Sequence, residues 1–80
     1  MSQYLLYHRH TSSDCAASFA AWNAFTSELR GVQAMSSCAH GAHEIWWWVE
    51  AADARSARAL LPAFVATRTL VIRVAPVTVP

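Results

Sequence analysis

The run HEIWWWVE at residues 43–50 constrains the fold most, because it is a strong strand pattern with tryptophan on both faces. Tryptophan, isoleucine and valine favour sheets, and side chains alternate between the two faces of a strand. The predicted faces are Ile45, Trp47 and Val49 on one side and Glu44, Trp46, Trp48 and Glu50 on the other. A strand of this kind belongs at the centre of a sheet that is covered on both sides.

The first half of the chain predicts a strand, a helix and a weaker strand. Residues 3–9 are rich in tyrosine and leucine and contain no breaker, which is typical of a strand. Residues 11–14, Thr-Ser-Ser-Asp, are helix-capping types. Apolar residues then recur at helical spacing until the stop signal at Gly31. Residues 32–38 predict the weaker strand, and a turn follows at 39–42.

The second half predicts a helix and a final strand. Asp53 can cap a helix, which Pro62 interrupts before one further helical turn. Residues 69–74 form the last strand. The order strand, helix, strand, strand, helix, strand predicts a single domain over residues 1–80 with a ferredoxin-like βαββαβ fold of the α+β class. In this fold a four-stranded antiparallel sheet carries two helices on one face.

The composition predicts a partner for the other face of that sheet. The chain is 55% hydrophobic and 14% charged, whereas typical globular domains are about 45–50% apolar and about 25% charged. A chain this short buries only roughly 60% of its unfolded surface. We therefore expect a homodimer packed through the open sheet faces, with Trp46 and Trp48 in the interface or in a ligand pocket. A monomer with an apolar surface is the alternative.

Charge and length argue against several classes of protein. The net charge is +1, lysine is absent, and the six arginines are scattered, so no nucleic-acid footprint is expected. No apolar stretch reaches about 18 residues, so no membrane span is expected. The N-terminus does not read as a signal peptide, and two cysteines are too few for a disulfide scaffold. We expect a cytoplasmic protein with free thiols.

The segment VEAADARSARALLPAFVATRTLVIRVAPV at residues 49–77 carries a resemblance. It resembles the second half of dimeric α+β-barrel proteins of the muconolactone-isomerase-like kind. It is also similar to small actinobacterial ferredoxin-like proteins that include nickel binders. The shared pattern is a strand ending in Val-Glu-Ala, a helix, a Leu-Pro break and a last strand ending in Val-x-Pro-Val. The resemblance implies a dimer whose sheets face each other, and no catalytic residue is carried over from it.

Every histidine and cysteine of the chain falls near one predicted edge of the sheet. In this topology the first two strands run parallel, so the end of the first strand, the start of the first helix and the turn after the second strand share that edge. Imidazole and thiolate are preferred ligands of zinc, nickel and copper. We therefore predict a site there for a divalent Zn, Ni or Cu ion. Its predicted ligands are His8, His10, Cys38, His40 and His43.

Three other interpretations stay open at this point. The histidines could be ordinary polar residues at strand ends, with Cys15 and Cys38 as small buried residues. The chain could be a small-molecule isomerase or cyclase of the dimeric-barrel type, with a histidine as acid or base and Glu44 orienting it. It could also be a structural interaction module. An enclosed apolar pocket that reaches a histidine would favour the enzyme, and dispersed histidines would favour the interaction module.

Overall fold

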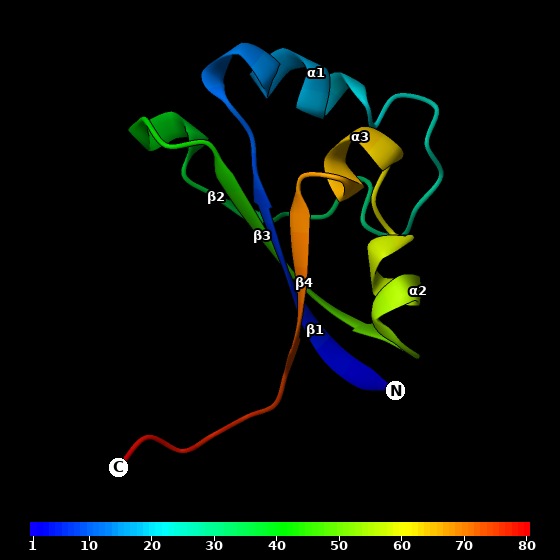
Figure 1. The fold of residues 1–80 in the computed structure, drawn as a ribbon, viewed down its shortest axis with the longest axis vertical. Coiled ribbons are helices and arrows are strands. Elements are labelled where there is room, and N and C mark those ends of the chain that lie inside the picture. The colour runs from blue at the N-terminus through cyan, green and yellow to red at the C-terminus, as the bar shows by residue number, and fades with distance from the viewer.

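The chain folds around a four-stranded antiparallel sheet, and the computed structural model describes all of residues 1–80 (Figure 1). The strands are β1 (Ser2–Arg9), β2 (Met35–Ser36), β3 (Glu44–Ala51) and β4 (Thr69–Val74), in the spatial order β2-β3-β1-β4. Every neighbouring pair is antiparallel. The predicted α+β class and antiparallel sheet are therefore confirmed. Because β1 and β2 both run antiparallel to β3, they point in the same direction.

The alternation of β3 separates a core face from an open face as predicted. Trp47 is buried, Trp46 is half-buried, and Trp48 is 64% exposed. In β1, Tyr4 with Leu6 and Leu5 with Tyr7 are equally acceptable core faces by sequence, and the structure buries Tyr4 and Leu6 and leaves Leu5 and Tyr7 on the open face. Leu6 lies opposite Trp47 in the β1–β3 register. The buried sheet positions are Tyr4, Leu6, His8, Ile45, Trp47, Val49, Ala51 and Thr69.

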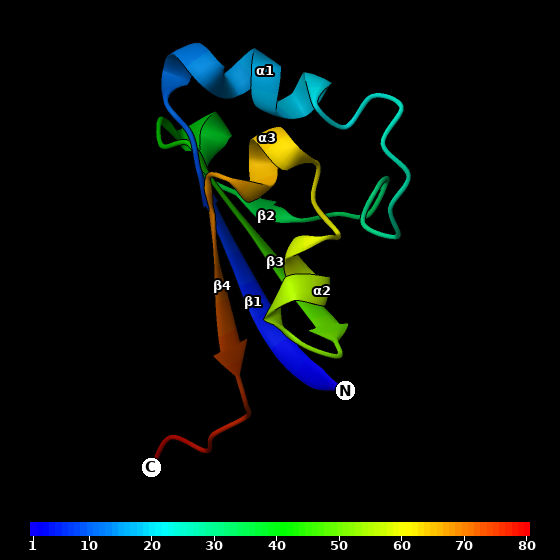
Figure 2. The same cartoon turned by 45° about the vertical axis from the view of Figure 1, so that its right-hand side comes forward.

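Short helices lie against the core face and across the end of the sheet where β1 ends (Figure 2). They are α1 (Cys15–Ala20), which follows the 3-10 turn η1 (Ser12–Asp14), and α2 (Ala54–Arg58) and α3 (Ala63–Ala66), which flank the predicted break at Pro62. The segment from α2 to α3 completes the core with Ala57, Leu61, Val65 and Ala66. None of these helices is long and apolar enough to cross a lipid bilayer.

The first helix is shorter than predicted, since the sequence pattern indicated a helix from Asp14 to an end near residues 27–30. It ends at Ala20, and turns follow as far as Ala24, whose left-handed φ of 62° cannot continue a right-handed helix. Trp22 then packs on Trp47, with 5.9 Å between ring centroids. The apolar spacing that predicted a long helix therefore reflects contacts that the loop after α1 makes with the sheet.

The second strand is also shorter than predicted. Only β2, two residues long, pairs with β3 inside the predicted range 32–38. The 3-10 turn η2 (Cys38–His40) follows, and Gly41 takes a left-handed φ of 91°. In both views α1 and η2 lie at the end of the sheet where β1 ends. This is the edge at which the sequence placed the histidines and cysteines.

Candidate metal centre

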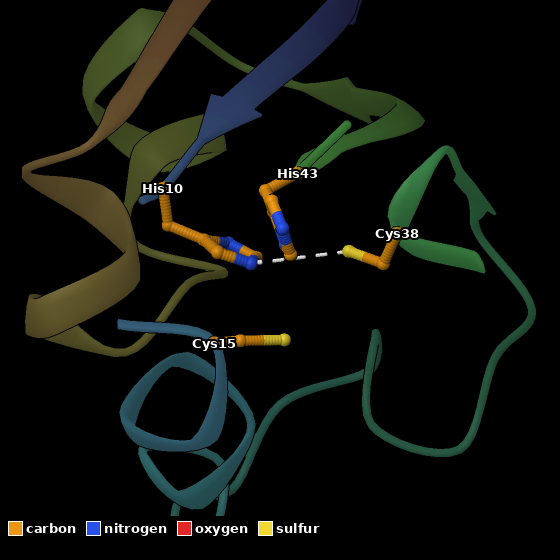
Figure 3. A group of neighbouring side chains, drawn as sticks. All are labelled: His10, Cys15, Cys38 and His43. Atoms are coloured by element: carbon orange, nitrogen blue, oxygen red, sulfur yellow. Dashed lines mark hydrogen bonds between the residues drawn. The ribbon is translucent and has the colours of Figure 1, made fainter. Parts of the chain in front are cut away.

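Two histidines and two cysteines converge at the end of the sheet where β1 ends (Figure 3). The residues are His10, Cys15, Cys38 and His43, and each offers one ligand atom. These four atoms lie within 4.8 Å of one another, and all four side chains are half-buried. Imidazole nitrogen and thiolate sulfur bind zinc, copper and nickel. This metal-binding group could therefore hold a metal ion.

The sheet brings the two histidines of the group together. His10 directly follows β1, and His43 directly precedes β3. The backbone N–H of His10 donates to the carbonyl of His43 at 3.0 Å, which continues the β1–β3 ladder beyond Arg9 and Glu44. Side chains of opposed strand residues share one face, and the two imidazole centroids are 5.3 Å apart.

The turn between β2 and β3 supplies the first cysteine. The backbone N–H of Ser37 donates to the carbonyl of Glu44 at 3.0 Å, which closes the hairpin. Gly41 then lets the chain turn back, because glycine adopts a left-handed φ without steric cost. This geometry places the Cys38 Sγ 3.8 Å from the His10 Nε2.

The short helix α1 supplies the second cysteine. Cys15 is its first residue and projects toward the two histidines (Figure 3). One turn later, the Phe19 ring lies edge-to-face against His10, with 6.4 Å between centroids. Ser18 is the only buried residue of α1. The helix therefore has little apolar anchorage of its own, and Cys15 and Phe19 link it to the end of the sheet.

The separations in the group suit a tetrahedral metal after a small adjustment. Zinc bonds of about 2.0–2.1 Å to nitrogen and about 2.3 Å to sulfur place tetrahedral ligand atoms roughly 3.3–3.8 Å apart. The pair of Cys38 Sγ and His10 Nε2, at 3.8 Å, already meets this spacing. The most distant pair in the group needs to close by about 1 Å. Rotation of half-buried side chains can supply a movement of that size.

His8 lies beside the metal-binding group and contacts one of its members. Its side chain is completely buried. The His8 Nδ1 is 3.1 Å from the Thr69 Oγ1 and 3.3 Å from the carbonyl oxygen of Val65, and the His8 Nε2 is 2.9 Å from the His10 Nδ1. Burial, and then the charge of His10, lower the pKa of His8. Burial, and then the charge of His43, lower the pKa of His10. Both rings therefore favour the neutral form, which is the form that binds metals.

The metal-binding group omits two of the five predicted ligands and contains one residue that was not among them. Of the predicted ligands it contains three, namely His10, Cys38 and His43. His40 is exposed on the turn and lies outside the group, as His8 does. Cys15 takes the fourth place. The sequence placed Cys15 at this edge of the sheet but also allowed it to be a buried helix residue. The feature that indicated a ligand is its position at the start of α1, shortly after His8 and His10 at the end of β1.

The two outward tryptophans of β3 lie on the open face of the sheet. Trp46 stacks on Tyr7 with 5.6 Å between centroids, and Trp48 is largely exposed. The Tyr7 hydroxyl donates to the Glu44 carboxylate, and this hydrogen bond raises the pKa of Tyr7. Glu44, which the sequence offered as an orienting partner for a histidine, is therefore bound to a tyrosine instead.

One polar atom of the group lacks a partner. The Nδ1 of His43 is buried and makes no hydrogen bond, although nearly all buried polar atoms in proteins are paired. A surface depression of about 410 Å³ is lined by both His10 and His43 together with Gly41 and neighbouring residues. A small ion can therefore approach the two imidazoles from solvent.

A separate apolar cavity of about 300 Å³ lies between α1, the loop after it and the sheet. Its lining includes Phe19, Trp22, Ile45 and Trp47 and none of the four histidines. Phe19 lies between this cavity and His10. An acid or base in the cavity would have to come from a residue type other than histidine.

Comparison with known proteins adds no further assignment. No family model, no curated protein and no solved structure matches the chain. The chemistry of the metal-binding group is therefore the observation from which a function can be argued.

Proposed function

We propose that the protein binds a divalent transition metal through His10, Cys15, Cys38 and His43, and that zinc is the preferred ion. The observation that carries this proposal is the convergence of the four ligand atoms within 4.8 Å. They come from four separate places in the chain: the end of β1, the start of α1, the turn η2 and the start of β3. Chance clustering of the only two cysteines with two of the four histidines is a poor explanation for that arrangement.

The donor set favours zinc among the candidate metals. Two imidazoles and two thiolates form the closed four-ligand set typical of structural zinc sites. Nickel(II) and copper(II) prefer square-planar or tetragonal geometry. Four ligands from four separate segments have no common backbone plane that would favour such a geometry. The ligand set holds no open position, so we propose a structural role for the ion rather than a hydrolytic one.

The architecture indicates what a bound ion would stabilise. Helix α1 is six residues long and buries only Ser18, whereas isolated helices shorter than about 12 residues are marginal in water. Small domains commonly use a metal to supplement a small core. An ion bound by Cys15 and Cys38 would join α1 and η2 to the two histidines at the sheet end.

The isomerase and interaction-module alternatives have less support. The apolar cavity reaches no histidine, and the His8 ring is buried with both nitrogens within hydrogen-bonding distance of protein atoms. The histidines of the metal-binding group are gathered with thiols rather than dispersed in solvent. These observations favour a metal ligand role for His10 and His43.

We also propose that the fold is ferredoxin-like, that the protein is a homodimer, and that it acts in the cytoplasm. The strand order and the grouping of helices on one face support the first part. The exposed side chains of the open sheet face support the second part, namely Met35, Trp48, Leu70 and Ile72. Both cysteines are free, which suits a reducing compartment.

Metal binding is tested by titration and by cobalt spectroscopy. Metal-free protein should take up a single Zn²⁺ per chain in competition with a chromophoric chelator. Co²⁺ should give the absorption of a tetrahedral ion with thiolate ligands, and Zn²⁺ should displace it. Ni²⁺ and copper, titrated in parallel, report whether zinc is the preferred ion. Absence of saturable uptake of any of these ions would refute the proposal.

Matched variants separate the ligands from their neighbours. Cys15→Ser should weaken zinc binding by at least about 100-fold, more than the 10–100-fold typical of outer-shell changes. His40→Ala is the control, since His40 is exposed on the same turn as Cys38 and lies outside the group. Its zinc affinity should equal that of the unmodified chain. An equal loss in both variants would contradict the assigned ligand set.

A further inference from the structure

The arrangement of His8 suggests a role next to the proposed metal site. His8 is the most deeply buried titratable side chain near the group, yet it is not a member of the group. It forms the middle link of a chain of close contacts that joins the core to His10. The donor and acceptor capacity of each partner fixes the direction of the hydrogen bonds in this chain.

The Nδ1 of His8 must carry a proton. The carbonyl oxygen of Val65, 3.3 Å from this nitrogen, can only accept a hydrogen bond. The Thr69 hydroxyl, 3.1 Å away, already donates its one proton to the same carbonyl at 2.7 Å. The His8 Nδ1–H therefore donates to the Thr69 Oγ1 and the Val65 carbonyl.

The protonation of His8 then determines the tautomer of His10. A neutral imidazole carries a proton on only one nitrogen, so the His8 Nε2 must accept. The His10 Nδ1, 2.9 Å away, therefore donates to it. The free lone pair of the His10 ring is therefore on its Nε2. This atom faces the Cys38 Sγ at 3.8 Å.

We infer that His8 is a positioning residue, which holds His10 in the tautomer and ring orientation that present Nε2 to the metal. The inference rests on the proposed function, because it concerns the same site. Metal-binding histidines typically donate their other N–H to a fixed acceptor, which sets the tautomer and raises ligand basicity. Here the acceptor is a second buried imidazole. It is anchored in turn to Val65 in α3 and to Thr69 at the start of β4.

The tautomer can be measured without any metal. Long-range ¹H–¹⁵N correlation spectra of metal-free protein at pH 8 should show the protons of both His8 and His10 on Nδ1. In His8→Leu, the His10 proton should move partly or wholly to Nε2, which is the commoner form of a free imidazole. A proton on the His10 Nε2 in the unmodified chain would overturn the inference, whatever the metal titration shows.

Affinity provides the second measurement. His8→Leu should bind zinc about 10–100-fold more weakly, while the cobalt spectrum keeps its pattern of two nitrogens and two sulfurs. His8→Gln, whose amide reaches the place of the imidazole Nε2, should recover much of the affinity, whereas His8→Asn, whose amide lies nearer the place of Nδ1, should not. Unchanged affinity in His8→Leu, or a cobalt spectrum that loses a nitrogen ligand, would overturn the inference.

A stability control separates positioning from general damage. Leu6→Ala removes a completely buried side chain on the same face of β1, two residues before His8. It should lower stability while the His10 tautomer and the zinc affinity of the folded protein stay unchanged. A shift of the tautomer in this variant would show that the effect of His8→Leu is structural. No zinc uptake by the unmodified chain would overturn both proposals, and the tautomer spectrum would then show whether the hydrogen-bond chain itself exists.

Discussion

At the scale of the residue, Asp53 illustrates how one side chain sets the start of a helix. Its backbone is extended, and its Oδ1 accepts the backbone N–H of Ser56 at 2.7 Å. This hydrogen bond, and then the Ser56 hydroxyl, lower the pKa of Asp53 below its usual range. The sequence predicted this cap, because aspartate before an alanine-rich helix is a common start signal.

The cap makes a pH-dependent contribution to stability. Because the pKa of Asp53 is lower in the folded state, its contribution is complete above the unfolded value of about 3.9 and is lost as the pH falls through the folded value. Asp53→Ala should therefore lower the melting temperature at pH 7, and the difference from the unmodified chain should shrink near pH 3. Thermal melts followed by circular dichroism between pH 3 and 7 measure this difference.

The matched control for the cap is Asp53→Ser, which keeps a capping oxygen without a titratable charge. The melting temperature of Asp53→Ser, relative to Asp53→Ala, should change little with pH. A difference between Asp53→Ala and the unmodified chain that grows toward pH 3 would contradict the assigned cap.

At the scale of the element, we expect α1 to depend on the proposed ion more than β1 or β3 does. It has a single buried residue, whereas β1 and β3 carry most of the core side chains of the sheet. Removing the metal with a chelator should therefore expose the amides of α1 to hydrogen exchange, while the amides of β1 and β3 stay protected. Hydrogen exchange read by NMR or mass spectrometry, with and without zinc, makes this comparison.

The same prediction sets how much zinc should stabilise the whole domain. Zinc at 100 times its dissociation constant should stabilise the fold by about 2.7 kcal/mol, which corresponds to roughly 10–20 °C in melting temperature for a domain of this size. Cys15→Ser should show neither the stabilisation nor the protection of α1. Equal protection of α1 with and without metal would contradict a structural role for the ion.

At the scale of the whole molecule, the sheet is covered on one face only. Trp48 is 64% exposed and lies opposite Leu5 in the register with β1. On the other side of β1, Leu70 is 61% exposed and lies opposite Tyr7. Apolar side chains from three neighbouring strands thus form one continuous surface, which is the arrangement typical of an interface between subunits.

Sedimentation equilibrium tests this surface as a dimer interface. The unmodified chain should sediment with twice the mass of one protomer, and Trp48→Glu should sediment as a monomer, because a buried carboxylate without a partner is strongly unfavourable. Ala63→Glu is the control, since it adds the same charge to an exposed position of α3 on the helical side. A monomeric unmodified chain would contradict the dimer.

Local patterns of the sequence predicted most of the elements. The final strand, the break at Pro62 and the two faces of β3 follow from side-chain alternation and backbone geometry, which act over a few residues. The length of α1 could not be predicted in this way. Trp22 continues the helical spacing of apolar residues, but its ring packs on Trp47 from a turn beyond the helix, and only the folded sheet provides that partner.

The sequence by itself determined that the histidines and cysteines would gather at one edge of an antiparallel sheet, since strand order and direction decide where chain ends meet. Only the tertiary structure decided which of them converge. It grouped Cys15 with His10, Cys38 and His43, left His40 on the surface of the turn, and buried His8 behind His10. The reason is that ligand geometry depends on contacts between distant segments. Strand register, the turn at Gly41 and the position of α1 set these contacts, and no short stretch of sequence contains them.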